Sequence, residues 1–286
     1  MSFHQTHTTK NDRALSEDEI ARFAPSVFAT EAHASRSERF APIPTIDILR
    51  GLRAEGFEVV GARQSGSRDE TRRDFTKHML RLRKMDGEAL RVGDTLFEIV
   101  LKNANDGTSA YDLMGGLFRL ICLNGMVVSD QTMGAVKVRH SGKALENVIE
   151  GTYRVLGDAQ LALAAPEQWA KVKLEREEQV ILAQSAHVLR FGDEGGGAAE
   201  AITAEALLRP RRSEDRFNDL WTTHNVIQEA CIKGGLQGQG RDANNRMRHY
   251  TSRPVNSIDA DVKLNKALWM LGERMAALKA PALNAA

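Results

Sequence analysis

The sequence is poor in cysteine and has no long hydrophobic run. Its 286 residues include only Cys122 and Cys231, and no C-x-x-C pair. This count excludes a disulfide framework and predicts two buried thiols in a reducing compartment. No apolar stretch approaches the roughly 20 residues that a membrane-spanning helix needs. The polar opening MSFHQTHTTKNDRALSEDE contains no secretory signal pattern, so we expect a soluble, cytoplasmic protein.

An excess of charge of one sign is also lacking. The chain has 39 Lys and Arg against 38 Asp and Glu, a formal net charge of +1. Any attraction to nucleic acid must therefore come from local clusters of basic residues. The sequence contains no G-x-S-x-G nucleophile elbow, and its histidines lack the spacing of metal ligands. We expect no catalytic residue, no metal and no cofactor.

Three segments of the first half have strand patterns. Residues 57–65, 74–84 and 95–103 combine apolar or alternating residues with turn sequences between them, including Asp-Gly in the second turn. Together they predict antiparallel strands. The next segment, YDLMGGLFRLICLNG at 111–125, places Leu113, Leu117, Leu120 and Ile121 on one helical stripe and ends in Asn-Gly. That pattern predicts a helix.

The later sequence is dominated by helical patterns. Long amphipathic stretches follow one another from residue 143 onward. We therefore predict an α+β fold with a strand-strand-strand-helix core. The expected division is a flexible segment over 1–30, the α+β core over 31–142, and a helical region over 143–286 that packs on the core as part of one continuous domain.

The second predicted strand carries an unusual number of cations. Its alternation places Lys77, Arg81 and Arg83 on one face, where Arg63 of the preceding strand could join them. A face with three cations is a poor core face. It is therefore either a solvated face or a binding surface.

A second basic cluster follows a glycine-rich stretch. In CIKGGLQGQGRDANNRMRHYTSRP, residues 231–254, four glycines fall within seven residues, and four arginines follow. The G-x-G-x-x-A arrangement comes after a helix rather than a strand, so it does not fit a dinucleotide fingerprint. We expect a pliable loop whose backbone approaches phosphates, with cations to bind phosphates and an aromatic ring to stack on a base. A solvated loop with arginines paired to neighbouring helices explains the charge equally well. The candidate nucleic-acid-binding residues are Lys77, Arg81, Arg83, Lys233, Arg241, Arg246, Arg248, Tyr250 and Arg253.

Several blocks of the sequence resemble one protein family. They are HASRSERFAPIPT, FTKHMLRLR, FRLICLNGMVV, LENVIEGTYRVL and NVIQEACIKGGLQGQGR, followed by YTSRPVNSIDADVKLNKALW. These blocks occur in the order found in the phage/plasmid-like family that is defined by a domain of unknown function, number nine-three-two. The resemblance extends from about Ala34 to Ala277. It implies carriage on phages and plasmids but no particular activity.

The predicted core is also distantly similar to the single-strand annealing recombinases of the Erf and RecT type. Those proteins hold a single strand by its backbone and act as oligomers. The similarity implies a non-catalytic protein that binds single-stranded DNA, anneals strands in recombination and forms a homo-oligomer. A protein-binding factor of a mobile element, such as a host-defence inhibitor or an establishment protein, is the alternative. A nuclease would need a cluster of acidic residues that the sequence does not reveal.

Overall fold

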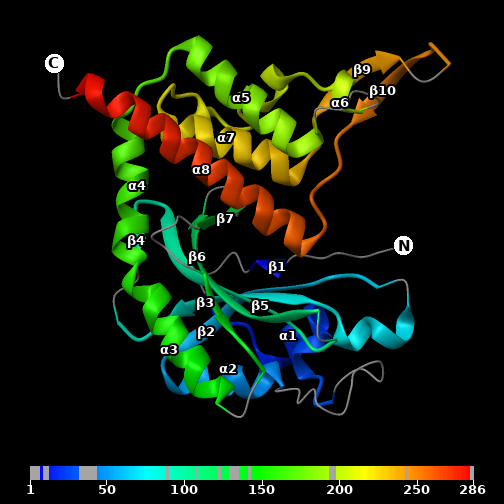
Figure 1. The fold of residues 1–286 in the computed structure, drawn as a ribbon, viewed down its shortest axis with the longest axis vertical. Coiled ribbons are helices and arrows are strands. Elements are labelled where there is room, and N and C mark those ends of the chain that lie inside the picture. The colour runs from blue at the N-terminus through cyan, green and yellow to red at the C-terminus, as the bar shows by residue number, and fades with distance from the viewer. Residues whose placement is uncertain are drawn as a thin grey trace. The chain divides into compact units, whose positions relative to one another are not determined.

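The computed structural model describes residues 7–8, 13–31, 44–67, 69–87, 90–106, 108–120, 124–128, 135–140, 143–192, 198–241 and 244–283. The chain divides into two compact units, Met1–Leu163 and Ala164–Ala286 (Figure 1). The first unit therefore extends beyond residue 142, where we predicted the core to end, because helix α3 (Ala144–Gly157) packs on its sheet.

An antiparallel sheet forms the first unit. Its order is β1-β2-β3-β5-β6-β7, while β4 pairs with β5 and β8 with β6. The three predicted strands and the α+β class are confirmed. The strands are β1 (His7–Thr8), β2 (Phe57–Gln64), β3 (His78–Lys84), β4 (Arg91–Val92), β5 (Thr95–Ala104), β6 (Ser109–Arg119), β7 (Asn124–Val128) and β8 (Val136–Val138).

The prediction of a helix at 111–125 is wrong. Residues 109–119 form the long strand β6, which pairs with β5 along almost its whole length. Leu113 and Leu117 lie four residues apart, a spacing that suits one face of a helix and one face of a strand equally well. Within the strand, Gly115 leaves room for the Phe97 ring on β5, because a Cβ there would come within 2.9 Å of that ring. The expected strand-strand-strand-helix core is therefore a meander of β2, β3, β5, β6 and β7 that precedes α3.

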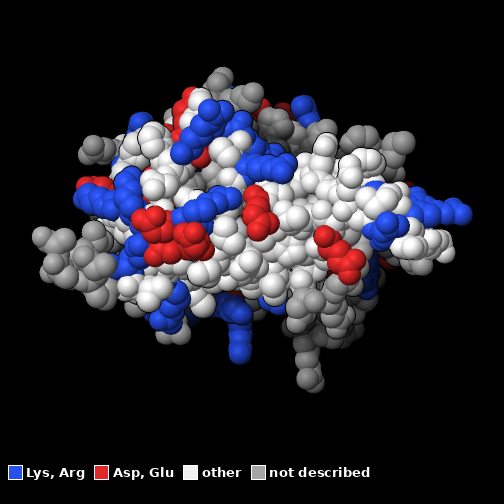
Figure 2. All heavy atoms as spheres, turned by 90° about the horizontal axis from the view of Figure 1, so that it is seen from above, with Lys and Arg blue, Asp and Glu red and all other residues white. Residues whose placement is uncertain are grey.

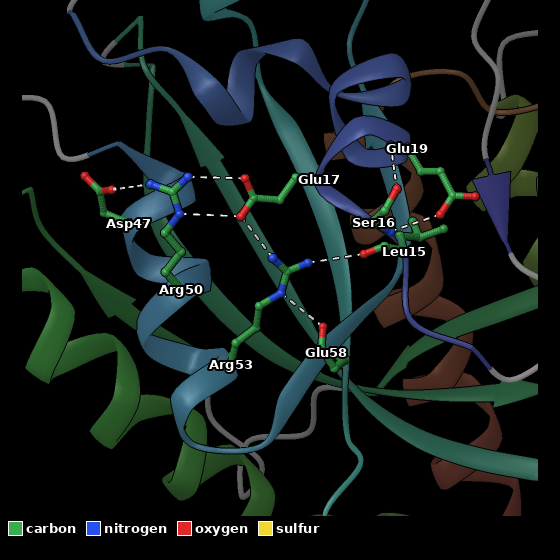
Figure 3. A network of polar contacts seen from close by, with 8 residues as sticks. All are labelled: Leu15, Ser16, Glu17, Glu19, Asp47, Arg50, Arg53 and Glu58. Atoms are coloured by element: carbon green, nitrogen blue, oxygen red, sulfur yellow. Dashed lines mark hydrogen bonds and ion pairs between the residues drawn. The ribbon is translucent and has the colours of Figure 1, made fainter.

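Ion pairs tie the N-terminal part of the first unit to its sheet. Within 1–30, which we predicted to be flexible, Ser16 and Glu19 form the capping box of α1 (Glu17–Phe23). Arg53 of α2 (Thr45–Ala54) donates to Glu17 at 3.1 Å, to Glu58 of β2 at 3.0 Å and to the Leu15 carbonyl at 3.2 Å (Figure 3). The short 3-10 helices η1 (Pro25–Phe28) and η2 (Glu70–Phe75) complete this unit.

A buried polar cluster lies under α2. The His78 ring of β3 bonds the Ser26 hydroxyl through Nδ1 at 2.8 Å and the Thr45 hydroxyl through Nε2 at 3.0 Å. The Asn103 amide of β5 also donates to Thr45, at 3.0 Å. Burial lowers the pKa of His78 to about 3. The cluster therefore joins η1, α2 and two strands through a neutral histidine.

Helices and one hairpin make up the second unit. Its core gathers all three tryptophans, with Trp169 stacked on Trp269 at 4.6 Å between ring centroids and Trp221 at 6.2 Å from Trp169. The elements are α4 (Ala159–Lys171), which spans the boundary in the chain, α5 (Arg176–Phe191), α6 (Ala198–Ala201), η3 (Ala204–Leu208), η4 (Ser213–Asp215), α7 (Leu220–Lys233), β9 (Gln237–Arg241), β10 (Met247–Thr251) and α8 (Ile258–Leu283).

The centre of the second unit is α7. Every residue of this helix from Leu220 to Cys231 is buried, and the helix contacts both α5 and α8. The predicted burial of Cys231 is confirmed, and desolvation raises the pKa of its thiol to about 12. Cys122 lies outside the described residues. No helix in the described part of the chain is long and apolar enough to cross a membrane.

Candidate nucleic-acid interface

The basic residues of β3 do not form an exposed face. The Glu98 carboxylate of β5 receives Arg81 Nε on one oxygen and an Arg83 guanidinium nitrogen on the other, both at 2.6 Å. The Glu98 side chain is 0% exposed and the two arginine side chains are 10% exposed. Arg81 also lies over the Phe118 ring, 3.7 Å from its centroid. Lys77 precedes β3 and is half-buried.

This arrangement corrects the expectation that Arg81 and Arg83 line an open binding face, whereas the role of Lys77 stays a prediction. Sequence alternation placed the two arginines on the correct common face. It could not show that Glu98, on the neighbouring strand, reaches both of them. Arg63 of β2, which lies opposite Met79 of β3, is buried as well. The two β3 arginines therefore hold a buried carboxylate rather than a solvent-facing ligand.

Lys233, at the end of α7, is likewise engaged with a buried acid. Its ammonium group lies 2.8 Å from Glu229, whose carboxylate also receives the Arg212 guanidinium. Burial alone would raise the Glu229 pKa, but hydrogen bonds from Arg212 and Lys233 outweigh it and hold that pKa below its usual value. Lys233 thus lacks the unneutralised charge that we expected it to offer to a phosphate.

The glycine-rich stretch forms a hairpin rather than a pliable loop. Strands β9 and β10 pair in register from Gln237 opposite Thr251 to Arg241 opposite Met247. Figure 1 shows this hairpin extending beyond the helices of the second unit. Asn245 adopts a φ of 62° in the turn, a left-handed conformation that asparagine tolerates better than most residues.

The glycines are explained by packing of the hairpin on α6. A Cβ at Gly238 would overlap the Ala201 carbonyl oxygen, and one at Gly240 would come within 3.0 Å of the Ala201 side chain. Both glycines lie on the same face of β9, because they are two residues apart. The G-x-G spacing therefore positions a backbone against a helix, and its role as a phosphate cradle is not needed to explain it.

The hairpin brings four of the predicted site residues together. Arg248 lies opposite Gly240, and Tyr250 opposite Gly238, on the α6 side; Arg241 belongs to the other face, and Arg246 to the turn. The three arginines are exposed, whereas Tyr250 is half-buried. Arg241 also donates to the Asn245 carbonyl at 2.8 Å and so braces the turn.

Two further arginines lie at the base of the hairpin. A pocket of about 350 Å³ is lined by the start of the hairpin and by the segment after η3, including Arg209 and Arg211. Both side chains are exposed, and Arg211 also donates to the Gly234 carbonyl. Arg253 follows β10 at the same base of the hairpin; it is exposed, and its carbonyl accepts from Arg190 at 2.6 Å. Sequence reasoning missed Arg209 and Arg211, although the run RPRR was a visible signal.

Comparison with known proteins identifies the family. A family model described as a domain of unknown function, DUF932, matches residues 32–269. The chain belongs to the DUF932 family. The proteins named UPF0380 protein YfjQ and UPF0380 protein YafZ, both from Escherichia coli strain K12, are each 42% identical over 273 residues, covering 96% of either chain. The family resemblance seen in the sequence is thus confirmed, and neither name states an activity. No solved structure matches the chain.

The contact of Gly238 with α6 gives a first prediction. Gly238→Ala should loosen the hairpin, because its new methyl group meets the Ala201 backbone rather than a flexible side chain; such overpacking costs about 1–3 kcal/mol. Trypsin should then cleave the hairpin arginines about tenfold faster, since cleavage follows the population of the opened state. Gln239→Ala, on the opposite hairpin face, is the control. Equal cleavage rates in the two variants would contradict the packing role.

Proposed function

We propose that the protein is a non-catalytic nucleic-acid-binding protein of a mobile element, and that it binds single-stranded DNA through the β9–β10 hairpin. The observation that carries this proposal is the exposure of Arg241, Arg246 and Arg248 on a single projecting hairpin. Guanidinium groups bind phosphates through several N–H donors, and a flexible single strand can follow so narrow a projection.

The distribution of charge supports a local rather than a global contact. One face of the molecule shows basic and acidic side chains intermixed, with uncharged surface between them (Figure 2). A net charge of +1 likewise gives no long-range field that would attract nucleic acid to every surface. Binding by this protein should therefore depend on the hairpin arginines and weaken steeply with salt.

Strand annealing remains the specific form of the proposal. It no longer draws support from a strand-strand-strand-helix core, because β6 replaces the expected helix. Annealing requires only that phosphates are neutralised while bases stay free to pair, so no catalytic group is needed. An annealing assay with complementary oligonucleotides, and light scattering to test for the expected homo-oligomer, address this form directly.

The triple variant R241A/R246A/R248A tests the hairpin as the binding element. Fluorescence anisotropy of a labelled single-stranded oligonucleotide should show weaker binding than in the wild type. The slope of log affinity against log salt concentration should fall by about 2, since each lost phosphate contact on a single strand removes about 0.7. A labelled duplex of the same sequence, titrated in parallel, measures the preference for single strands.

The matched control removes the same charge elsewhere in the second unit. Lys173, Lys263 and Arg274 are exposed, so K173A/K263A/R274A changes the net charge equally without touching the hairpin. We expect this control to keep the wild-type affinity and salt slope. If both triple variants lost the same affinity, the change in net charge would explain the effect and the hairpin would not. Failure of the wild type to bind any oligonucleotide at low salt would overturn the proposal. The search would then turn to the alternative, a contact of the hairpin arginines with an acidic protein surface.

A further inference from the structure

A second arginine-containing pocket lies within the same unit and is not explained by the hairpin. It has a volume of about 310 Å³ and is formed by the beginning of α5, the segment 208–218 and one face of α7. The pocket is lined by both polar and apolar groups, including Arg176, Gln179, Pro210, Arg216, Phe217 and Asn218. Its size falls at the lower end of the range for small-ligand sites.

The most unusual member of this pocket is Phe217. Its side chain is 66% exposed. A phenylalanine is normally buried, because burying its large apolar area stabilises the fold. A solvent-facing aromatic ring beside a polar pocket is a suitable surface for stacking a nucleobase. Because the ring is already exposed in the free protein, its replacement should leave the core of the unit intact.

The charged lining favours an anion. Arg176 and Arg216 are exposed, and among the described residues neither forms an ion pair. The pocket also contains Asp215, but this carboxylate is buried and accepts Arg212 Nε at 2.8 Å, so its charge is compensated. The pocket therefore offers two guanidinium groups to a phosphate without an opposing unpaired acid.

Amide groups supply the hydrogen bonds that the edge of a base would need. The Asn218 side chain donates to the Leu174 carbonyl at 3.3 Å, which leaves its amide oxygen as an acceptor. Gln179 lies between Arg176 and Thr223, accepting from the former at 3.3 Å and donating to the latter at 3.5 Å. A stacking ring, two cations and orientable amides are the three elements by which proteins hold an unstacked nucleotide.

Pro210 links this pocket to the hairpin. It lines both the Phe217 pocket and the pocket at the hairpin base that contains Arg209 and Arg211. The two pockets thus adjoin on either side of one short segment. A strand bound along the hairpin would need to pass only this segment to place its next nucleotides beside Phe217.

We propose that the Phe217 pocket holds one unstacked nucleotide of the bound single strand, with its base on the Phe217 ring and its phosphate at Arg176 and Arg216. This inference rests on the proposed function and adds to it a subsite that contacts a base. The hairpin arginines then supply backbone contacts that are indifferent to the presence of bases, whereas the pocket requires a base.

The test compares two labelled oligonucleotides of equal length, one of thymidine nucleotides and one of abasic sugar-phosphate units, by anisotropy at a fixed salt concentration. Wild-type protein should bind the base-containing strand about tenfold more tightly, the value of one stacked base. Phe217→Ala should remove this preference while leaving affinity for the abasic strand unchanged. Phe217→Tyr should retain it, and so should Leu278→Ala, which removes another exposed apolar side chain of the same unit.

The outcomes separate the subsite from the hairpin. Equal binding of the two strands by wild type overturns the subsite and leaves the hairpin proposal standing. A preference that survives in Phe217→Ala also overturns the subsite, because the base must then be bound elsewhere, for instance at Tyr250. Failure of wild type to bind either strand removes the proposed function and the subsite together.

Discussion

Glu98→Ala should destabilise the first unit by about 3–5 kcal/mol, the usual cost of leaving a buried charge without its partner. The variant would leave Arg81 and Arg83 side by side with no carboxylate between them, and both guanidinium groups are almost wholly buried. Two like charges in that position repel, and water reaches them poorly. The loss should therefore exceed that of any surface ion pair, which contributes about 0–1 kcal/mol.

Urea unfolding followed by circular dichroism measures this change, and tryptophan fluorescence assigns it to a unit. Trp169, Trp221 and Trp269 all lie in Ala164–Ala286, so their emission reports on the second unit alone. The backbone signal of the sheet should be lost at lower urea than in wild type. Glu58→Ala is the control, because Glu58 is partly exposed and its partner Arg53 keeps other acceptors. If both variants lost similar stability, the cluster of Arg81, Arg83 and Glu98 would not be the reason for the destabilisation.

The fold could be predicted where local pattern and tertiary packing agree. The segments that became β2, β3 and β5 alternate or form short apolar runs between turn residues, and each is a strand. At β6, the spacing of Leu113 and Leu117 fitted both the helical and the strand periodicity. The contact between Gly115 and the Phe97 ring joins residues eighteen positions apart in the chain and is invisible to local pattern. Two adjacent glycines were the available warning, since glycine is unfavourable inside a helix.

The candidate site could be predicted only as far as charge clusters along the chain. The arginines of the hairpin are close in sequence and remain close in space, so Arg241, Arg246 and Arg248 were found together. The β3 arginines looked similar, but their partner Glu98 comes from another strand. The Phe217 pocket combines the start of α5 with a segment thirty or more residues later. Such combinations depend on helix packing, which the sequence pattern does not specify.

A buried histidine in the second unit makes the protein sensitive to acid. The Nε2–H of His224 donates to the Leu268 carbonyl at 2.9 Å, while the ring lies 5.3 Å from Trp169 between centroids. Its Nδ1 is buried without a hydrogen-bond partner among the described residues. Desolvation lowers the pKa of His224 to about 4, so the folded unit holds the ring neutral under ordinary conditions.

Stability of the second unit should fall as the pH falls from about 6.5 toward 4. In this range the unfolded chain protonates His224, whose ordinary pKa is about 6.5, while the folded unit does not. Protons therefore favour the unfolded state, and this one group reduces the free energy of unfolding by about 1.4 kcal/mol per pH unit. Above pH 6.5 the group is neutral in both states and contributes no pH dependence.

His224→Gln isolates this contribution. The glutamine amide can replace the Nε2–H donor to Leu268 but cannot titrate, so any loss of packing with Trp169 affects its stability equally at both pH values. Urea unfolding followed by tryptophan fluorescence at pH 7 and pH 5 should show a stability difference about 2 kcal/mol smaller in the variant than in wild type, because the histidine term acts over about 1.5 pH units. If both proteins lose the same stability, the acid sensitivity of this unit comes from its carboxylates and His224 is not its source.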